Sequence, residues 1–348
     1  MPESGPPPLT PDPAEFQPRP GWGRRGAKVF SLAMSAALLA ALYRAVDIRL
    51  IVRELRGVDT AWLIVSVGMI VPITLLRAIR FYRVAPPGAV PGVAEALRLT
   101  LVSSAANVFL PAKSGDLIKS YFVAKRRGAS AGVSVAMVIY ERLCDLVGLI
   151  TWCALGWFVA RPVVAGVPAA LWPLLSLFGA LCGVLISSER VARLGAALCA
   201  RILSGRLPRV QALADGWPGL LHMLGGRRAP VIALSLLLWL VHVIQIWMFT
   251  VALSVHIPFT VSASLSAVAL MLGQLPFTFA GLGARDVALV VLMKAYVRPE
   301  SAAALGLLIS TRNLLPPLAA LPIVRPYLTT LAGDVRLAAR QSPNPGEA

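Results

Sequence analysis

The stretch "VSVAMVIYERLCDLVGLITWCALGWF", Val133 to Phe158, decides the class of fold. It is longer than the ~20 predominantly apolar residues that an α-helix needs to cross the hydrocarbon core of a bilayer. Three charged residues, Glu141, Arg142 and Asp145, lie near its middle with apolar residues on both sides. We therefore expect a transmembrane helix that carries charged side chains deep in the membrane.

The composition of the whole chain indicates many such helices. Of its 348 residues, 57% are hydrophobic and only 14% are charged, which is more apolar surface than one soluble core can bury. Apolar segments lie at about 29–46, 61–80, 131–160, 163–187, 229–255, 262–280, 284–297 and 301–324. We expect an all-α, polytopic transmembrane helix bundle of about six to eight spans within residues 28–330.

Several classes of function are not expected. The formal net charge of +17 lies in short segments between apolar runs, where Lys and Arg set membrane orientation, so nucleic acid is not an expected partner. The four cysteines and three histidines lack the spacing of metal ligands, and there is no phosphate-binding loop or complete dinucleotide motif. We therefore expect neither a metal nor a cofactor.

The distribution of basic residues predicts the orientation. Segments 19–28, 77–83, 119–127, 190–228 and 325–340 are rich in Lys and Arg and should be cytoplasmic. Both termini, a disordered proline-rich tail at 1–27 and a tail at 331–348, are then cytoplasmic. The high content of Ala, Gly and Arg favours a bacterial cytoplasmic (inner) membrane.

Two loops follow from this orientation. The basic segment 188–228 is a cytoplasmic loop that either lies flat on the membrane or simply connects two spans. The segment 44–59 is external although it contains four arginines, which is against the usual bias.

The polar stretch "LPAKSGDLIKS", Leu110 to Ser120, is expected at membrane depth. The basic segments on either side of it both belong in the cytoplasm, and one full crossing cannot return to its own side. A re-entrant hairpin near 93–124, broken at Pro111 and Gly115, satisfies this condition. A cytoplasmic loop after an interfacial helix is the alternative.

A second stretch repeats the pattern. "LPFTFAGLGARD", Leu275 to Asp286, again combines Leu-Pro, glycines and an aspartate. We expect Pro276, Gly281 and Gly283 to break a second re-entrant segment near 262–297. The interval from Asp116 to Arg142 equals that from Asp286 to Arg312, so we predict two inverted repeats.

The charges within the spans are the candidate transport site. Each costs about 2.5–3.5 kcal/mol at a helix centre, so they should face protein or water. In one hypothesis, the guanidinium groups of Arg142 and Arg312 bind a phosphate. In the other they form structural ion pairs, Arg142 with Asp145 or Asp116, and Arg312 with Asp286. The candidate site residues are Asp116, Lys119, Glu141, Arg142, Asp145, Arg285, Asp286, Arg312 and Asn313.

These residues carry a resemblance to a known family. "NVFLPAKSGDLIKSYFVAKRRGASAGVSVAMVIYERLCD", "LPFTFAGLGARDVALVVLM" and a later "STRN" together resemble the lysylphosphatidylglycerol synthase transmembrane, or flippase-like, family over roughly 30–330. The resemblance places the family's motif residues on Pro111, Gly115, Asp116, Glu141, Arg142, Asp145, Pro276, Gly281, Gly283, Arg285 and Asp286. Both motif acids are usually Glu in the family and are Asp here, one methylene shorter.

The resemblance implies a membrane domain that moves lipids or lipid-linked sugars between leaflets. We expect a translocator whose partners are membrane lipids with polar or anionic head groups, phospholipid or isoprenoid-linked, and a lipid-synthesis enzyme. Aminoacyl transfer would need a soluble domain, and the chain ends soon after its last span, so a synthase is not expected. The alternatives are a membrane-embedded transferase for lipid-phosphate sugars, with Asp116, Glu141 or Asp286 as base, and a non-catalytic partner of a synthesis complex.

Overall fold

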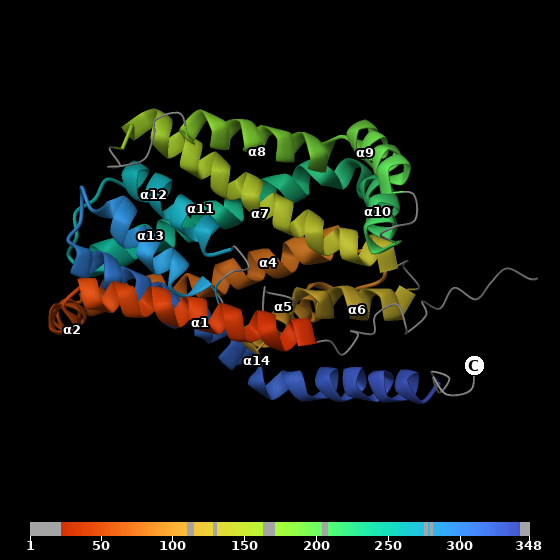
Figure 1. Cartoon of the computed structure of the whole chain (residues 1–348), viewed down its shortest axis with the longest axis horizontal. Coiled ribbons are helices and arrows are strands. Elements are labelled where there is room, and N and C mark those ends of the chain that lie inside the picture. Colours follow the sequence, from red (N-terminus) through yellow and green to blue (C-terminus); the bar gives the residue numbers. More distant parts are fainter. Residues whose placement is uncertain are drawn as a thin grey trace, which may run out of the picture.

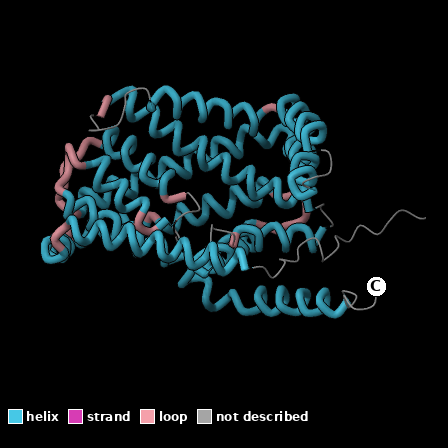
Figure 2. The backbone as a smooth tube through the Cα atoms, in the orientation of Figure 1, coloured by secondary structure: helices cyan, strands magenta, loops and turns pink. Residues whose placement is uncertain are grey.

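The computed structural model describes residues 22–109, 115–127, 131–162, 171–203, 208–274, 278 and 281–341. In this part of the chain the secondary structure is helical, with no strand (Figure 2). The long helices lie side by side in one bundle (Figure 1). The prediction of an all-α bundle is therefore confirmed.

The helices, in chain order, are α1 (Trp22–Ala45), α2 (Ile48–Arg56), α3 (Thr60–Gly68), α4 (Ile70–Val84), α5 (Val93–Phe109), α6 (Asp116–Arg127), α7 (Ala131–Ala160), α8 (Leu171–Ser187), α9 (Glu189–Leu203), α10 (Pro208–Leu224), the short 3₁₀ helix η3 (Gly225–Arg227), α11 (Arg228–Ala252), α12 (Phe259–Leu272), α13 (Ala284–Met293) and α14 (Pro299–Gln341). Helix α14 continues through four internal prolines into the predicted C-terminal tail. The tail residues 1–21 and 342–348 lie outside the described residues.

Several of these helices have the length and hydropathy of membrane spans. Among the described residues four qualify, Thr60–Val84, Gly132–Ala160, Gly216–Ala252 and Pro299–Asp334. Two bent helix pairs, which begin with α1 and α8, raise the number to six if each pair counts as one span. The chain is thus a multi-pass membrane protein with four to six candidate spans among the described residues, while the expected number of six to eight stays a prediction.

Two hairpins of short helices lie in different halves of the bundle. Helices α5 and α6 pack against each other in one half, whereas α12 and α13 pack against each other in the other half (Figure 1). Residues 110–114, 275–277 and 279–280, which include Pro111 and Pro276, lie outside the described residues.

Two amphipathic helices turn across the ends of the bundle. Helix α2 follows α1 at an angle of 85°, and α9 follows α8 at 94°. They lie at opposite ends of the molecule (Figure 1). The segment 188–228, expected as a basic loop, therefore contains α9 and α10, and the segment 44–59 contains α2.

The apolar core is divided into two clusters. One surrounds α12 and α13 and includes Leu265, Leu289 and Ile309; the other surrounds α5, α6 and α10 and includes Phe81 and Tyr140. Helix α7 contributes to both.

Candidate functional site

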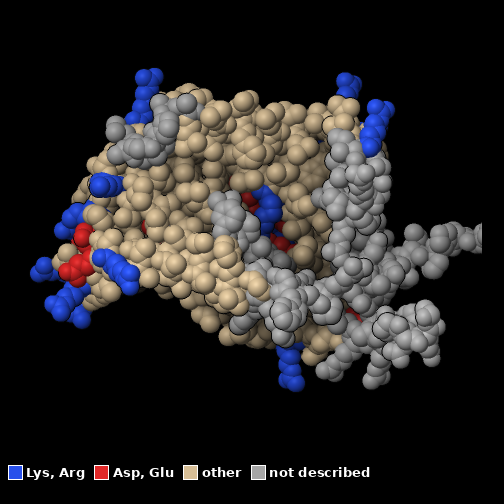
Figure 3. Space-filling view, viewed as in Figure 1, with Lys and Arg blue, Asp and Glu red and all other residues tan. Residues whose placement is uncertain are grey.

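A polar cavity of about 190 Å³ lies in the middle of the bundle. Helices α4, α5, α6, α7, α11 and α14 supply its walls. The charged side chains that line it are Arg77, Arg80, Asp116, Lys119, Glu141, Arg142, Asp145 and Arg312. In the space-filling view, basic and acidic side chains occupy a hollow in the middle of one face, whose other visible charged side chains lie toward its edges (Figure 3).

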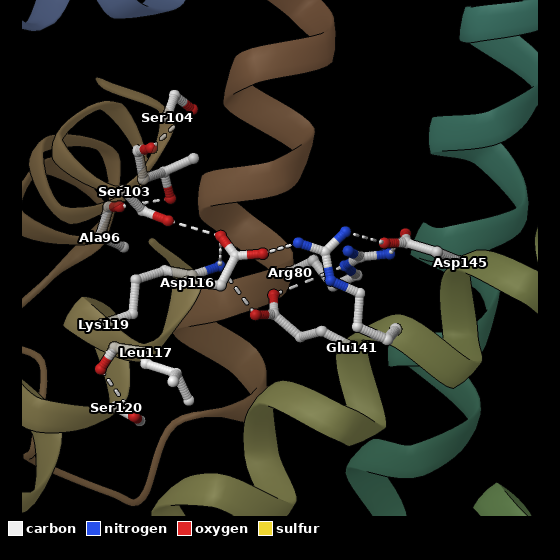
Figure 4. Close-up of polar contacts among 12 residues, drawn as sticks. Arg80, Ala96, Ser103, Ser104, Asp116, Leu117, Lys119, Ser120, Glu141 and Asp145 are labelled. Atoms are coloured by element: carbon white, nitrogen blue, oxygen red, sulfur yellow. Dashed lines mark hydrogen bonds and ion pairs between the residues drawn. The ribbon is translucent and has the colours of Figure 1, made fainter. Parts of the chain in front are cut away.

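Arg80 joins α4 to α7 through two acids. Its Nη1 donates to Asp145 Oδ1 at 2.6 Å, and its Nε lies 3.8 Å from Glu141 Oε1 (Figure 4). Trp239 Nε1 on α11 donates to the same Asp145 oxygen at 3.0 Å. Since Arg80 is 4% exposed, these ion pairs are buried, and loss of either partner would leave an unpaired charge.

Asp116, at the start of α6, is the polar centre of the first hairpin. Ser103 Oγ donates to its Oδ1 at 2.5 Å and Asn107 Nδ2 at 3.3 Å, both from α5. Arg142 on α7 forms an ion pair with its Oδ2 and lies 3.9 Å from Asp145. The expected pairing of Arg142 with Asp116 is therefore present, and it ties the hairpin to α7.

Lys119 completes this network one turn later on α6. Its Nζ lies 2.9 Å from Glu141 Oε2 and 3.7 Å from Asp116 Oδ1 (Figure 4). The Lys119 side chain is buried and also lies over the ring of Phe81, at 5.1 Å from its centroid. Five of the predicted site residues, Asp116, Lys119, Glu141, Arg142 and Asp145, thus meet on one wall of the cavity.

Arg312 on α14 has partners different from those expected. Its Nη1 donates to Gln245 Oε1 at 2.5 Å, and its Nη2 to Asn313 Oδ1 at 3.2 Å. Gln245 is itself held by a bond from its Nε2 to the Ser66 carbonyl at 2.6 Å. The hypothesis of an ion pair between Arg312 and Asp286 is wrong, because the Arg312 guanidinium donates its hydrogen bonds to the neutral amides of Gln245 and Asn313.

Asp286 serves the second hairpin instead. Its Oδ1 accepts from Arg285 Nη2 at 2.7 Å, and its Oδ2 accepts the Gly283 N–H at 3.0 Å, which caps α13. Arg285 also donates to Ser310 Oγ on α14 at 2.5 Å. The pair therefore connects α13 to α14. Arg285 also lines a smaller pocket of about 70 Å³ beside the main cavity.

Glycine is required at the predicted helix-breaking positions for two different reasons. Gly281 and Gly283 have φ values of +78° and +88°, in the left-handed region that L-residues with a side chain avoid. Gly115 precedes α6, and a Cβ there would lie 2.6 Å from the Asn107 backbone nitrogen. It is the close approach of α5 and α6 that requires this glycine.

Sequence reasoning missed four residues around the cavity, Arg77, Arg80, His242 and Gln245. The segment 77–83 was expected to be cytoplasmic because of its arginines, whereas it forms the last turns of a span that ends at Val84. A signal did exist, because Arg77 and Arg80 are three residues apart and share a helix face. That spacing indicates a polar stripe that faces protein.

Comparison with known protein families shows to which family the chain belongs. The family described as "Lysylphosphatidylglycerol synthase TM region" matches residues 28–320. The chain belongs to this family. Membership makes the chain a membrane protein of lipid metabolism or transport. The matched segment includes both hairpins and every charged residue that lines the cavity. No curated protein and no solved structure gave a match.

Proposed function

We propose that this protein is an integral membrane lipid translocator, which moves a polar or anionic lipid, or a lipid-linked precursor, between the leaflets of the bacterial cytoplasmic membrane. The observation that carries the proposal is a charged cavity bordered by all four helices of membrane-spanning length among the described residues, together with the short helices α5 and α6. Ionised groups are costly at this depth and occur in membrane proteins mainly where a polar substrate passes.

The position of the charged hollow supports a lipid as the substrate. The hollow lies on a face parallel to the long helices, which is the direction of the surrounding acyl chains (Figures 1 and 3). A head group can enter such a hollow while its acyl or isoprenoid tails stay in the bilayer. This arrangement avoids moving the apolar tails through a polar site.

The two hairpins suggest how access alternates. One forms a wall of the main cavity through α5 and α6, and residues of the other, Gly273, Gln274 and Gly281, line the smaller pocket. We infer that the hairpins belong to two inverted repeats, whose relative movement opens the cavity first to one leaflet and then to the other. Arg142, between Asp116 and Asp145, can exchange partners as this happens.

The orientation follows the same proposal. Helix α1 begins and α14 ends toward the end of the bundle that holds α9 and α10 (Figure 1). With that end in the cytoplasm, both termini are cytoplasmic, and a lipid-synthesis enzyme on that side can deliver its product directly to the cavity.

The proposal is tested by leaflet exchange of labelled lipids in proteoliposomes, with anionic, zwitterionic and isoprenoid-phosphate head groups in parallel. Wild type should move at least one class, and Arg142→Gln and Arg312→Gln should each abolish the movement although both variants insert and fold. The matched control is Arg193→Gln, because Arg193 is exposed on α9 outside the cavity.

Two results would contradict translocation. A chemically altered lipid, found by mass spectrometry after incubation with the purified protein, would identify a transferase. Unchanged lipid with no movement of any head-group class would favour a non-catalytic partner of a synthesis complex. If both arginine variants fail to fold, the two arginines would support the fold rather than translocation.

A further inference from the structure

The charges that line the main cavity do not balance. Five basic side chains and three acidic ones face it, apart from His242. The acids are all engaged, Asp145 and Glu141 with Arg80, Glu141 with Lys119, and Asp116 with Arg142. Three of the cations are thus neutralised by close contact. The remaining two positive charges belong to Arg77 and Arg312.

Neither of these two arginines has a carboxylate within ion-pair distance among the described residues. Arg312 is 4% exposed and is held only by the amide oxygens of Gln245 and Asn313. Its Nε–H is buried without a hydrogen-bond acceptor in the described part of the chain. A buried guanidinium with an unused donor is expensive, and binding of an anion would remove that cost.

Arg77 and Arg312 both lie at the junction of the two cavities. Arg77, His242, Arg312 and Asn313 each line both the main cavity and the smaller pocket, so they stand where the two meet. They come from three helices, α4, α11 and α14. Donors that converge from separate helices form a built site, because each is fixed by the packing of its own helix.

We propose that Arg77 and Arg312 form a binding site for a phosphate group, with Asn313 as an additional polar contact. A planar guanidinium presents two parallel N–H donors, which match the oxygens of a phosphate monoester or diester. Two such groups from different helices, α4 and α14, can hold one phosphate between them. This assigns phosphate recognition to Arg77 and Arg312, whereas Arg142 holds the first hairpin through Asp116.

This inference rests on the proposed function and narrows its substrate class to lipids that carry a phosphate. It also places the site relative to the two hairpins. The main cavity is lined by the first hairpin and the smaller pocket by the second, and the phosphate site lies at their junction. A phosphate held there would lie between the α5 and α6 residues that line the main cavity and the residues Gly273 and Gly281 that line the smaller pocket.

The test is binding rather than transport. The full-length protein in detergent is titrated calorimetrically with dihexanoylphosphatidylglycerol, with dihexanoylglycerol as the uncharged analogue, and with inorganic phosphate. Wild type should bind the phosphatidylglycerol at least tenfold more tightly than the uncharged analogue. Arg77→Gln and Arg312→Gln should each weaken that binding about tenfold or more, while Arg193→Gln leaves it unchanged.

Arg77→Lys and Arg312→Lys keep the proposal testable if a Gln variant does not fold. They retain the charge but lose the planar pair of donors, so binding should weaken less than in the Gln variants. Binding of inorganic phosphate that depends on the same two arginines, without binding of the lipid, would retain the site and make free phosphate its ligand. Equal affinity for charged and uncharged lipid, or full affinity in folded Arg77→Gln and Arg312→Gln proteins, would overturn it.

The two proposals can fail separately. Binding that depends on Arg77 and Arg312, in a protein that moves no lipid, leaves the phosphate site intact and removes translocation. Movement of lipid that is unaffected in both Gln variants leaves translocation intact and removes the phosphate site.

Discussion

Arg80 on α4 donates to Asp145 on α7 at 2.6 Å, and this contact joins residues 65 positions apart in the sequence. Both side chains are buried, Arg80 to 4% and Asp145 to 7% exposure. The pair closes one wall of the polar cavity and holds together the two helices that carry most of its charges. It is thus part of the site and part of the fold.

The first prediction concerns this pair. Arg80→Gln should destabilise the protein by about 3–5 kcal/mol, because it leaves Asp145 buried without its ion-pair partner. The measurement is the thermal unfolding midpoint of the purified protein in detergent. In the control, Arg98→Gln, the change should be small, because the Arg98–Glu95 pair on α5 is exposed on the arginine side.

The same pair predicts the outcome of a double variant. Arg80→Met with Asp145→Leu removes both charges and replaces them with apolar side chains, so it should be more stable than Arg80→Gln alone. A double variant as unstable as the sum of the single ones would show that the two residues act independently.

The second prediction concerns the second hairpin. Gly281→Ala should destabilise the protein by about 1–3 kcal/mol, because residue 281 has φ +78° and its new Cβ would overlap the Gly273 carbonyl. Translocation should fall with it, since both glycines line the smaller pocket. The readouts are the unfolding midpoint and leaflet exchange.

The control for this change is Gly183→Ala on α8. Nothing lies within 4 Å of a Cβ at that helical position, so the substitution should leave the protein unchanged or slightly more stable. A Gly281→Ala protein as stable and active as this control would show that the tight turn at 281 is dispensable.

The third prediction concerns a contact between α6 and the end of α14. Lys125 Nζ lies 2.5 Å from Asp334 Oδ2, and the Tyr121 hydroxyl donates to the same oxygen. Asp334→Asn should loosen the last turns of α14 and speed their amide hydrogen exchange. Global stability should fall by no more than about 1 kcal/mol, because such partly exposed pairs are weak.

Its control is Arg298→Gln at the other end of the bundle, where Arg298 pairs with Glu54 on α2. That change should leave exchange at the end of α14 as in wild type. Unaltered exchange in Asp334→Asn as well would mean that apolar packing alone holds α14 in place.

Much of this architecture could be predicted from the sequence, because membrane spans depend on local composition. The run around Glu141 is long and apolar, and it forms α7 as expected. The hairpins could be inferred too, since glycines and prolines interrupt apolar runs at Gly115 and Gly281. These signals are local, and the bilayer requires that backbone groups be satisfied within each segment.

The partners of the charges could not be predicted in the same way. Arg312 bonds to Gln245 rather than to Asp286, and Arg80 lines the cavity, which its place in a basic segment did not indicate. Pairing between helices depends on the rotation and relative depth of each helix. Side-chain packing determines both quantities, and the hydrophobic periodicity of the sequence does not reveal them. Asp286 instead accepts a hydrogen bond from Arg285, its neighbour in the sequence.

The last prediction concerns orientation, which can be tested with single cysteines. Helices α2 and α9 cross opposite ends of the bundle, so Arg49 and Arg193, both exposed, should lie on opposite sides of the membrane (Figure 1). In a background without the native cysteines, a membrane-impermeant maleimide should label Arg49→Cys in intact cells and Arg193→Cys only after lysis. The physical reason is the basic segment 190–228, which favours the cytoplasm.

Each variant should be labelled fully in detergent, which controls for access to the thiol. The reverse pattern, with Arg193→Cys labelled in intact cells, would invert the orientation and place both termini outside. The cavity and its charge pairs would be unaffected, but a cytoplasmic synthesis enzyme would then face α2 rather than α9. Labelling of both positions in intact cells would contradict the assignment of α2 and α9 to opposite sides.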